Sequence, residues 1–329
     1  MSTAASRLSF GTPHQLEVLH AMEGFVRQQV ELHLERRKLW FPNELQPADS
    51  GSTPEDDALI VRMREAARGI PAAVLVALAL NLLTEEGLPH FHRLIAVHLG
   101  NESPWVEWNN LWTAEEDRHG CAIRDYVRDA RLYSMTQLEK LQYSYLEAGF
   151  EPDWERDPYR LLAYTSLQEK ATQIAHSNTG RQAGNYEPRL QRVLAHISGD
   201  ESRHYQFYRA SFGEILARDP NQALVSLQKV TLGFEMPGHN VPSYGDMSEV
   251  IRRADIFGPR QYQKIVEELL EFWKIGELTG LNATGEEARD KLMKVPKRLS
   301  RIADYADAKA SRKTFKFDFL PAERQTLEM

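Results

Sequence analysis

Two short segments of this chain repeat a pattern that is suited to binding metal ions. Residues 115–119 read EEDRH and residues 200–204 read DESRH, so both follow the order acidic-Glu-x-Arg-His. Residues at positions i and i+3 lie on one face of a helix. Each segment can therefore present one carboxylate and one imidazole to the same cation.

An isolated glutamate precedes each segment at nearly the same distance. Glu85 lies 31 residues before Glu116, and Glu169 lies 32 residues before Glu201. The halves are thus offset by 84 residues at the isolated glutamates and by 85 at the paired ones, as the duplication of a helix pair would give. We predict one metal-binding set of six side chains: Glu85, Glu116, His119, Glu169, Glu201 and His204.

The types of these six side chains indicate which metal they bind. Carboxylates and imidazoles from four helices match the ligands of ferritin-like di-iron and di-manganese proteins. Hard oxygen ligands tolerate the oxidation of Fe(II) to Fe(III), and a single imidazole per metal leaves coordination positions open for O₂. We therefore predict a cofactor of two iron ions (Fe2+/Fe3+) per subunit.

A single Glu-x-x-His pattern is weak evidence, because both residues are common on exposed helix faces. Glu17 and His20 form a third instance without a partner glutamate, and we interpret this pair as helix surface. Surface exposure of the repeated set would not explain why two segments and two glutamates keep register. The repeat favours a metal site.

The residues beside the predicted ligands are suited to orienting them. A metal-bound imidazole usually donates its second N–H to a carboxylate or a carbonyl. By the symmetry of the repeat, we pair Asp200 with His119 and Glu115 with His204. The arginines that are expected to balance buried carboxylate charge are Arg118 and Arg203.

Two further expectations concern a proline and the other histidines. Pro89 lacks the N–H that would bond the Glu85 carbonyl, so we expect a distorted helix there. The remaining histidines are interpreted as structural or exposed. They include His90, His92, His98 and His176.

The fold class is predicted as all-α, because apolar residues recur at helical spacing and no strand-like alternation stands out. We expect a ferritin-like four-helix bundle core with additional helices in one domain, 1–329, with about 53 N-terminal residues as helix plus loop and an irregular tail after about 312. Predicted loops lie at 42–57 and 236–246. Predicted helices cover 16–39, 54–69, 72–99, 104–130, 135–148, 158–183, 188–218, 221–234, 261–278 and 286–309.

Composition excludes several functional classes. The 329 residues are 42% hydrophobic and 26% charged, as in globular proteins, and a net charge of −7 argues against general nucleic-acid binding. The longest apolar stretch, 74–83, is far shorter than the ~20 residues of a membrane span, so we predict a buried core helix and no membrane insertion. Cys121, the sole cysteine, is predicted to be a small buried residue. Its isolation and the lack of an N-terminal apolar segment favour a cytoplasmic protein.

Basic residues gather in two places along this acidic chain. Residues 288–316 contain ten Lys or Arg against three Asp, and a second cluster occupies residues 36–38, just before Trp40. Solvated helix faces would explain both clusters. Docking surfaces for acidic protein partners would explain them equally well.

The chain resembles the soluble acyl-acyl carrier protein desaturases from about Leu16 to Lys309. The motifs that carry the resemblance are LTEEGLP at 83–89, WTAEE at 112–116 continuing to Gly120, YTSLQEKAT at 164–172, DESRH at 200–204 and LTGL at 278–281. The resemblance implies a homodimer of helical subunits, each with a di-iron site beside a narrow apolar channel. It also implies an enzyme of fatty acid biosynthesis that uses O₂ and two electrons from ferredoxin to introduce a cis double bond into a carrier-tethered acyl chain.

The resemblance also suggests roles for individual residues. Trp40 and Asp200 match an electron route through His119, although Trp40 is equally consistent with a core aromatic. Thr172 matches a hydroxyl that takes part in oxygen activation. Acyl carrier protein and ferredoxin are both acidic, and we expect the carrier at residues 36–38 and ferredoxin at residues 288–316.

Some residues depart from the plant enzymes. The connection from Glu85 to Glu116 is shorter, and Leu161 and Leu162 replace a glycine and a phenylalanine near the channel. Four residues also fall where the family lines the channel's far end: Leu94, Ile95, Val97 and His98. Acyl length and double-bond position are therefore open, and the absence of a plastid transit sequence suits a bacterial protein.

Three other functions are compatible with the six predicted ligands. One is another O₂-activating di-iron oxidase or oxygenase with a different substrate. A second is a non-enzymatic ferritin-like iron-binding protein. The third, a ribonucleotide reductase small subunit, would require a radical tyrosine near the metal site.

Overall fold

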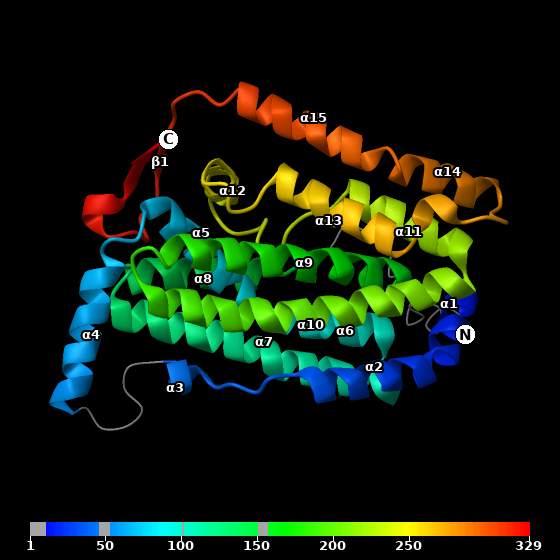
Figure 1. Ribbon diagram of the computed structural model, residues 1–329, viewed down its shortest axis with the longest axis horizontal. Coiled ribbons are helices and arrows are strands. Elements are labelled where there is room, and N and C mark those ends of the chain that lie inside the picture. Colours follow the sequence, from blue (N-terminus) through cyan, green and yellow to red (C-terminus); the bar gives the residue numbers. More distant parts are fainter. Residues whose placement is uncertain (1–10, 46–52, 101, 151–156) are drawn as a thin grey trace, which may run out of the picture.

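The computed structural model describes residues 11–45, 53–100, 102–150 and 157–329, and almost all of its regular structure is helical (Figure 1). The predicted all-α class is confirmed. The α-helices are α1 Pro13–Ala21, α2 Glu23–Arg36, α3 Pro42–Leu45, α4 Pro54–Ala67, α5 Ala72–Glu85, α6 Leu88–Leu99, α7 Ser103–Ala130, α8 Met135–Ala148, α9 Pro158–Ala183, α10 Pro188–Arg218, α11 Pro220–Leu232, α12 Tyr244–Arg253, α13 Pro259–Phe272, α14 Ala283–Leu292 and α15 Val295–Ala308. Short elements follow or interrupt them: η2 Ile275–Glu277, β1 Thr314–Lys316, η3 Ala322–Arg324 and β2 Thr326–Glu328.

Three consecutive helices begin with the same local device. Asp157, Glu187 and Asp219 each precede a proline, and their side chains accept hydrogen bonds from the first free backbone N–H groups of α9, α10 and α11. An acidic cap also suits the positive end of the helix dipole, and proline is tolerated at the first helical position. These signals fix where the long helices start.

The polar residues of α7, α9 and α10 lie near mid-length, between two clusters of buried apolar side chains. The first cluster includes Trp105, Leu161 and Phe212, and the second includes Leu78, Tyr126 and Leu194. Along α7 and α9 the chain passes from the first cluster to the second, whereas along α10 it passes from the second to the first. Helix α5 packs in the second cluster. It is followed by α6, which packs in the first cluster. Helices α5 and α10 therefore run antiparallel to α7 and α9, so that a polar layer crosses the middle of an apolar bundle.

Additional helices cover the bundle on two sides (Figure 1). Helices α2 and α3 pack against α7 and α10 along one side. On the other side α11 and α13 pack on α9, and α14 and α15 lie outside them. The bundle core with additional helices is as predicted, and the assignment of residues 1–329 to one domain stays a prediction.

Most predicted helices are confirmed, and those at 135–148, 158–183 and 188–218 have the predicted bounds. Besides the helix at 72–99, three predicted helices were divided or too long. The helix at 16–39 is divided into α1 and α2, the helix at 286–309 is divided into α14 and α15, and the helix at 261–278 ends at Phe272 before η2. Residues 46–52 of the predicted loop at 42–57 lie outside the described residues, and α3 occupies its start.

The predicted helix at 72–99 is divided by a break at Glu86 and Gly87, as the proline at position 89 indicated. A side chain on Gly87 would meet Tyr145, since a Cβ there would lie 2.7 Å from the Tyr145 hydroxyl oxygen. Glycine thus permits the close approach of Tyr145 at the break, and Glu85 is the last residue of α5. Both features place the Glu85 carboxylate at a helix end.

Two predicted irregular segments contain regular structure. Helix α12 begins inside the predicted loop at 236–246, and the tail after 312 forms a two-stranded antiparallel sheet. Phe315 pairs with Leu327 in that sheet, and both side chains are buried. The tail is therefore ordered because it adds apolar side chains to the second cluster.

Two sequence expectations about exposure have opposite outcomes. Cys121 is exposed, so its prediction as a buried residue was wrong: it lies on the outer face of α7, opposite the buried stripe. Residues 74–83 are mostly buried, as predicted for a core helix.

Among the described helices, none is by itself long and apolar enough to cross a membrane. Helices α4 and α5 reach the required length only together, and they are bent by 116° relative to each other.

Candidate metal centre

The six side chains predicted as ligands come together in the polar layer of the bundle. Glu85 ends α5, Glu116 and His119 lie on α7, Glu169 lies on α9, and α10 contributes the second Glu-x-x-His pair. All six are buried, with 0–7% of their surface exposed. Potential ligand atoms lie within 4.8 Å of one another in two groups: Glu85, Glu116, His119 and Glu201; and Glu116, Glu169, Glu201 and His204.

The Nδ1 atom of each imidazole faces carboxylates. His119 Nδ1 lies 3.5 Å from Glu85 Oε2, 3.5 Å from Glu116 Oε2 and 3.4 Å from Glu201 Oε1. His204 Nδ1 lies 2.9 Å from Glu116 Oε1 and 3.6 Å from Glu169 Oε2. Within the described part of the chain, neither Nδ1 atom makes a well-formed hydrogen bond. Buried polar atoms without such bonds are costly, so these atoms fit a pair of cations between them.

The charges in the cluster alter its acid–base behaviour. Burial and the Glu201 charge raise the pKa of Glu169 well above its usual range. Burial alone would lower the pKa of His119 and His204, but the facing carboxylates outweigh it and raise both values well above 6.5. A cluster that holds protons so strongly can exchange them for cations of higher charge.

Asp200 and His119 form the first predicted orienting pair, and the structure confirms it. His119 Nε2 lies 3.2 Å from Asp200 Oδ2, which also accepts a hydrogen bond of 2.8 Å from Trp40 Nε1 and one of 3.1 Å from Arg118. Arg203 binds the other oxygen of Asp200. Both arginines of the repeat thus face one carboxylate, and Trp40 is a buried aromatic in direct contact with it.

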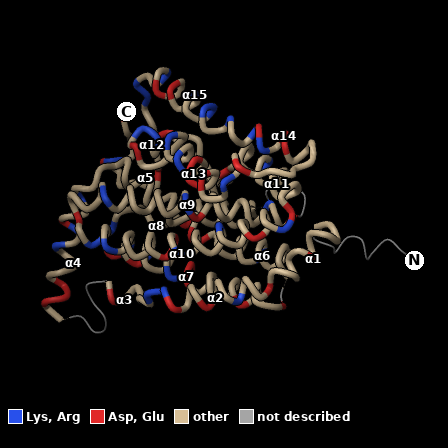
Figure 2. Tube along the Cα trace, turned by 45° about the vertical axis from the view of Figure 1, so that its right-hand side comes forward, with Lys and Arg blue, Asp and Glu red and all other residues tan. Residues whose placement is uncertain are grey.

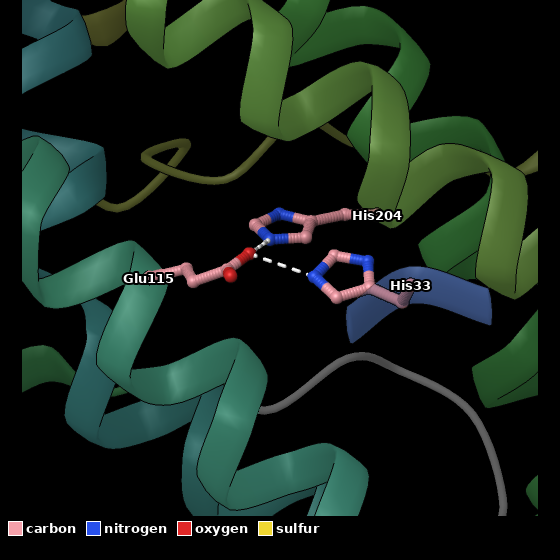
Figure 3. Close-up of side chains that lie close together, drawn as sticks. All are labelled: His33, Glu115 and His204. Carbon is pink, nitrogen blue, oxygen red and sulfur yellow. Dashed lines mark hydrogen bonds and ion pairs between the residues drawn. The ribbon is translucent and has the colours of Figure 1, made fainter. Parts of the chain in front are cut away.

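Glu115 and His204 form the second predicted pair, which is also confirmed. His204 Nε2 lies 2.9 Å from Glu115 Oε2, and His33 Nε2 on α2 lies 3.0 Å from the same oxygen (Figure 3). His33 was not predicted. It lies 82 residues before Glu115 and belongs to no repeat, so the sequence carried no signal that would place it here.

His176 was interpreted as a structural or exposed residue, and the structure places it, buried, against a predicted ligand. It is 1% exposed, and its Nε2 lies 2.6 Å from Glu85 Oε1 while Asn81 contacts its Nδ1. Its position seven residues after Glu169 places it on the same face of α9, a spacing that could have identified it. His176 therefore orients the carboxylate at the end of α5.

The other histidine interpretations hold. His90 and His98 bond backbone carbonyl oxygens, and His92 bonds the Thr113 hydroxyl. The side chains of Glu17 and His20 are 79% and 83% exposed, as expected for helix surface.

Thr172 lies one helical turn after Glu169 and reaches the ligand cluster. Its Oγ1 lies 3.1 Å from Glu201 Oε2 and also within hydrogen-bonding distance of backbone carbonyls in the preceding turn. Thr172 lines two neighbouring cavities. A hydroxyl is thus available at the point where these cavities meet the carboxylates.

A cavity of about 620 Å³ extends from Thr172 toward the outside of the molecule. Side chains of α5, α9, α12, α13 and α15 and of the segment 234–239 form its walls, which are mostly apolar. A much smaller cavity of about 20 Å³ touches Glu85, Glu116 and Glu201, and both cavities share Thr84, Thr172 and Pro237. The large cavity therefore leads to the predicted ligands.

The residues expected beside the channel do not line either cavity. Leu161, Leu162 and Ile95 are buried in the first apolar cluster, and Leu94 packs against it. The small cavity instead ends against Leu88, Phe91 and Trp112. These side chains limit the space beyond the carboxylates.

The two basic clusters lie on opposite sides of the bundle (Figure 2). Lys294, Lys297, Arg298 and Arg301 are exposed at i, i+3, i+4 and i+7 in or next to α15, whose Leu299 and Ile302 form part of the large cavity's wall. Such spacing places the four charges on one helical face. The other cluster, residues 36–38, precedes Trp40 between α2 and α3, with Leu39 58% and Phe41 56% exposed.

Comparisons with known proteins found similar sequences over most of the chain. The family model described as fatty acid desaturase matches residues 14–320. A chloroplastic stearoyl-[acyl-carrier-protein] 9-desaturase from Gossypium hirsutum is 32% identical over 321 residues, which cover 92% of this chain and 80% of that protein. A protein of Mycobacterium tuberculosis named "Putative acyl-[acyl-carrier-protein] desaturase DesA1" is 33% identical over 303 residues, with coverages of 88% and 87%.

A solved structure supports the fold. The X-ray structure of DesA2 from Mycobacterium tuberculosis H37Rv, a protein named in the same way, matches with a TM-score of 0.60 and 17% identity. The match covers 83% of this chain and 99% of that one.

Proposed function

We propose a function from the premise that this chain belongs to the fatty acid desaturase family and, within it, to the acyl-acyl carrier protein desaturases. It is accordingly an enzyme, an oxidoreductase that acts on acyl chains held by acyl carrier protein. The finer proposal is that it uses O₂, two electrons from ferredoxin and a di-iron centre to introduce one cis double bond. For each pair of hydrogens removed from neighbouring methylenes, the reaction consumes one O₂, two electrons and two protons and releases two water molecules.

The observation that carries the proposal is the sharing of two carboxylates between the two ligand groups. Glu116 and Glu201 belong to both groups, whereas Glu85 with His119 and Glu169 with His204 belong to one each. Each group would hold one cation, and the carboxylates of Glu116 and Glu201 would be available to both, which matches the ligand set of ferritin-like carboxylate proteins. When bound, two iron ions would supply the oxidising power for hydrogen removal.

The protein's own contribution would be to position the acyl chain. The walls of the large cavity are mostly apolar, so they favour a hydrocarbon chain and exclude water from it. Thr84, Thr172 and Pro237 would guide that chain past the carboxylates, and Leu88 and Phe91 would stop it. Positioning of this kind decides which carbons react. The Thr172 hydroxyl, 3.1 Å from Glu201, could hold a proton beside the reacting carbons.

Electrons are proposed to enter through Trp40. Its indole N–H binds Asp200, which in turn binds His119, so a continuous hydrogen-bonded path leads from the ring to a proposed ligand. Exposed Leu39 and Phe41 beside it, next to basic residues 36–38, suit an acidic electron carrier such as ferredoxin.

This assignment reverses the sequence-based expectation for the two basic clusters. The basic face of α15 adjoins the wall of the large cavity, where a carrier protein must sit to insert its acyl chain. We therefore propose that acyl carrier protein docks on α15 and that ferredoxin docks at residues 36–38. The two partners would then bind on opposite sides and could bind together. The homodimer and the cytoplasmic location stay predictions.

One reconstituted reaction tests the proposal. Iron-loaded protein is incubated with stearoyl-acyl carrier protein, ferredoxin, a reductase and O₂, and the products are examined for an alkene across several acyl lengths. Formation of a cis alkene that requires iron and ferredoxin is the expected result. Absence of alkene at every length would refute the desaturase activity.

The same preparation separates the rival functions. An iron-storage protein would accumulate a mineral core, whereas we expect about two iron ions per chain. A different di-iron oxygenase would consume O₂ without forming an alkene. A ribonucleotide reductase would show a tyrosyl radical spectrum, for which Tyr208, fully buried beside Trp108, is one tyrosine to examine, and we expect no such spectrum here.

A further inference from the structure

His33 occupies a position that neither repeat explains. It lies on α2, outside the four helices that carry the proposed ligands, yet it is 5% exposed and faces the polar layer. Its ring packs edge-on against Trp108, with centroids 5.1 Å apart, and lies nearly parallel to the His204 ring at 5.9 Å. These contacts hold the imidazole in one orientation.

His33 and His204 lie within hydrogen-bonding distance of the same carboxylate oxygen. His33 Nε2 and His204 Nε2 lie 3.0 Å and 2.9 Å from Glu115 Oε2 (Figure 3). If each nitrogen donates a proton, the carboxylate is fixed between them, and His204 keeps the lone pair of Nδ1 toward the proposed metal position. The tautomer of His204 thus depends on where Glu115 points.

The two orienting carboxylates differ in how firmly they are held. Asp200 has donors from Trp40, Arg118 and Arg203 besides His119. Glu115 has Arg118 only at 4.0 Å, and its Oε1 is buried without a hydrogen bond within the described residues. Apart from His204, the main hydrogen-bond partner of Glu115 is therefore His33. Asp200 has three donors apart from His119.

We propose that His33 is a positioning residue for one metal position, the one formed by His204 with Glu116, Glu169 and Glu201. The inference rests on the proposed di-metal centre and adds to it an asymmetry between its halves. Loss of His33 frees Glu115 to rotate and His204 to change tautomer. Loss of an orienting partner typically lowers metal affinity by about 10- to 100-fold, and this loss falls on one ion of the two.

The experiment is an anaerobic Fe(II) titration of His33→Leu, His33→Gln and the unaltered protein, with iron analysis after desalting. A glutamine amide can still donate to Glu115, so His33→Gln should retain two ions per chain. His33→Leu should bind the first ion with unchanged affinity and the second about 10- to 100-fold more weakly. His92→Leu is the matched control, because the hydrogen bond of His92 goes to the Thr113 hydroxyl and not to a proposed ligand or to Glu115.

Each outcome has one meaning. Two ions with unaltered affinity in His33→Leu would overturn the role of His33 and leave the di-iron proposal intact. Fewer than two ions in the unaltered protein would instead refute the di-iron centre itself. If circular dichroism shows that His33→Leu does not fold, His33→Asn replaces it. The asparagine side chain is one methylene shorter than glutamine, so its amide does not reach Glu115. We therefore expect His33→Asn to lose the second ion and His33→Gln to retain it. Equal binding by Asn and Gln would overturn the inference.

Discussion

The indole ring of Trp40 lies parallel to the imidazole of His119, with ring centroids 6.3 Å apart and planes 6° apart. Asp200 joins the two rings by hydrogen bonds on the side opposite the proposed metal position. Arg118 lies over the indole at 5.2 Å and also binds Asp200, so one cation faces both groups. Parallel rings and hydrogen bonds thus connect the segment next to residues 36–38 with a proposed ligand.

Trp40→Phe should separate electron delivery from metal binding. Phenylalanine keeps an aromatic ring but loses the N–H that binds Asp200, while Arg118 and Arg203 still hold this carboxylate. We expect about two iron ions per chain and a turnover rate with ferredoxin that is about 10- to 100-fold lower. Iron analysis and steady-state kinetics check both. Trp273→Phe, which loses a bond to a backbone carbonyl far from the site, should change neither. Full activity of Trp40→Phe would exclude Trp40 from the route.

Glu201→Ala should remove iron and activity while the helices persist. Glu201 belongs to both ligand groups, so both metal positions lose a carboxylate. The helix around it is held by apolar residues of two clusters, and we expect the helical signal in circular dichroism to be almost unchanged. Glu214→Ala, on the same helix but paired with Arg218 near the surface, should retain two ions. Normal iron content in Glu201→Ala would refute its assignment as a ligand.

The sequence was sufficient for the six proposed ligands because helical spacing converts residue order into geometry. Glu116 and His119 are three residues apart on one helix, so their proximity needs no knowledge of the fold. The repeat then supplied the second half. His33 was missed because its contact with Glu115 crosses between helices at a separation of 82 residues. The contact of His176 with Glu85 spans 91 residues, and only its spacing of seven from Glu169 could have indicated it. Such contacts depend on how helices pack.

The fold was predictable where helices are long and marked by caps, and less so elsewhere. Helix α12 was hidden because Pro242 and Gly245 suggest a loop, and Ser243 in fact adopts a left-handed conformation with φ of 66° before the helix starts. Strands β1 and β2 have three residues each, too few to show alternation. Phe319, between the two strands, packs edge-on against Tyr133, a contact that the sequence does not show.

Charge reversal at the two basic clusters should affect different partners. Lys297→Glu with Arg298→Glu should raise the KM for acyl-acyl carrier protein several-fold, because like charges then oppose an acidic carrier beside the cavity. Arg36→Glu with Lys38→Glu should instead raise the KM for ferredoxin. Both effects should weaken at high salt, since the residues are exposed.

Each double variant serves as the control for the other, because both change the net charge equally. Steady-state kinetics with one partner varied at a time distinguishes them. Should reversal at residues 36 and 38 impair only the carrier, the original assignment of the clusters would be restored. Equal effects on both partners would indicate a general charge effect.

The stability of the metal-free protein should fall as the pH rises above about 6.5. The facing carboxylates outweigh burial and raise the pKa values of His119 and His204 above 6.5, so their stabilising protons are fully bound below 6.5 and are lost as the pH rises through the folded-state values. Glu169 acts in the same direction, since burial and Glu201 raise its pKa. Glu201 acts at acidic pH. Burial alone would raise its pKa, but hydrogen bonds with His119 and His204 outweigh burial and hold the pKa well below 4.5. The stability that the ionised Glu201 contributes is therefore lost as the pH falls from 4.5 through the folded-state value.

Metal ions should reverse the trend at high pH, because they replace the bound protons and need deprotonated ligands. Thermal unfolding of metal-free and Fe(II)-loaded protein, measured anaerobically from about pH 4 to about pH 9, should show a difference in melting temperature that widens as the pH rises. Calorimetric titration in buffers of different ionisation enthalpy should detect proton release on Fe(II) binding. Glu169→Gln removes one of the groups with a raised pKa, so it should release fewer protons, whereas His92→Gln should behave as the unaltered protein. A metal-free melting temperature that increases steadily above pH 6.5 would contradict the assigned charge states.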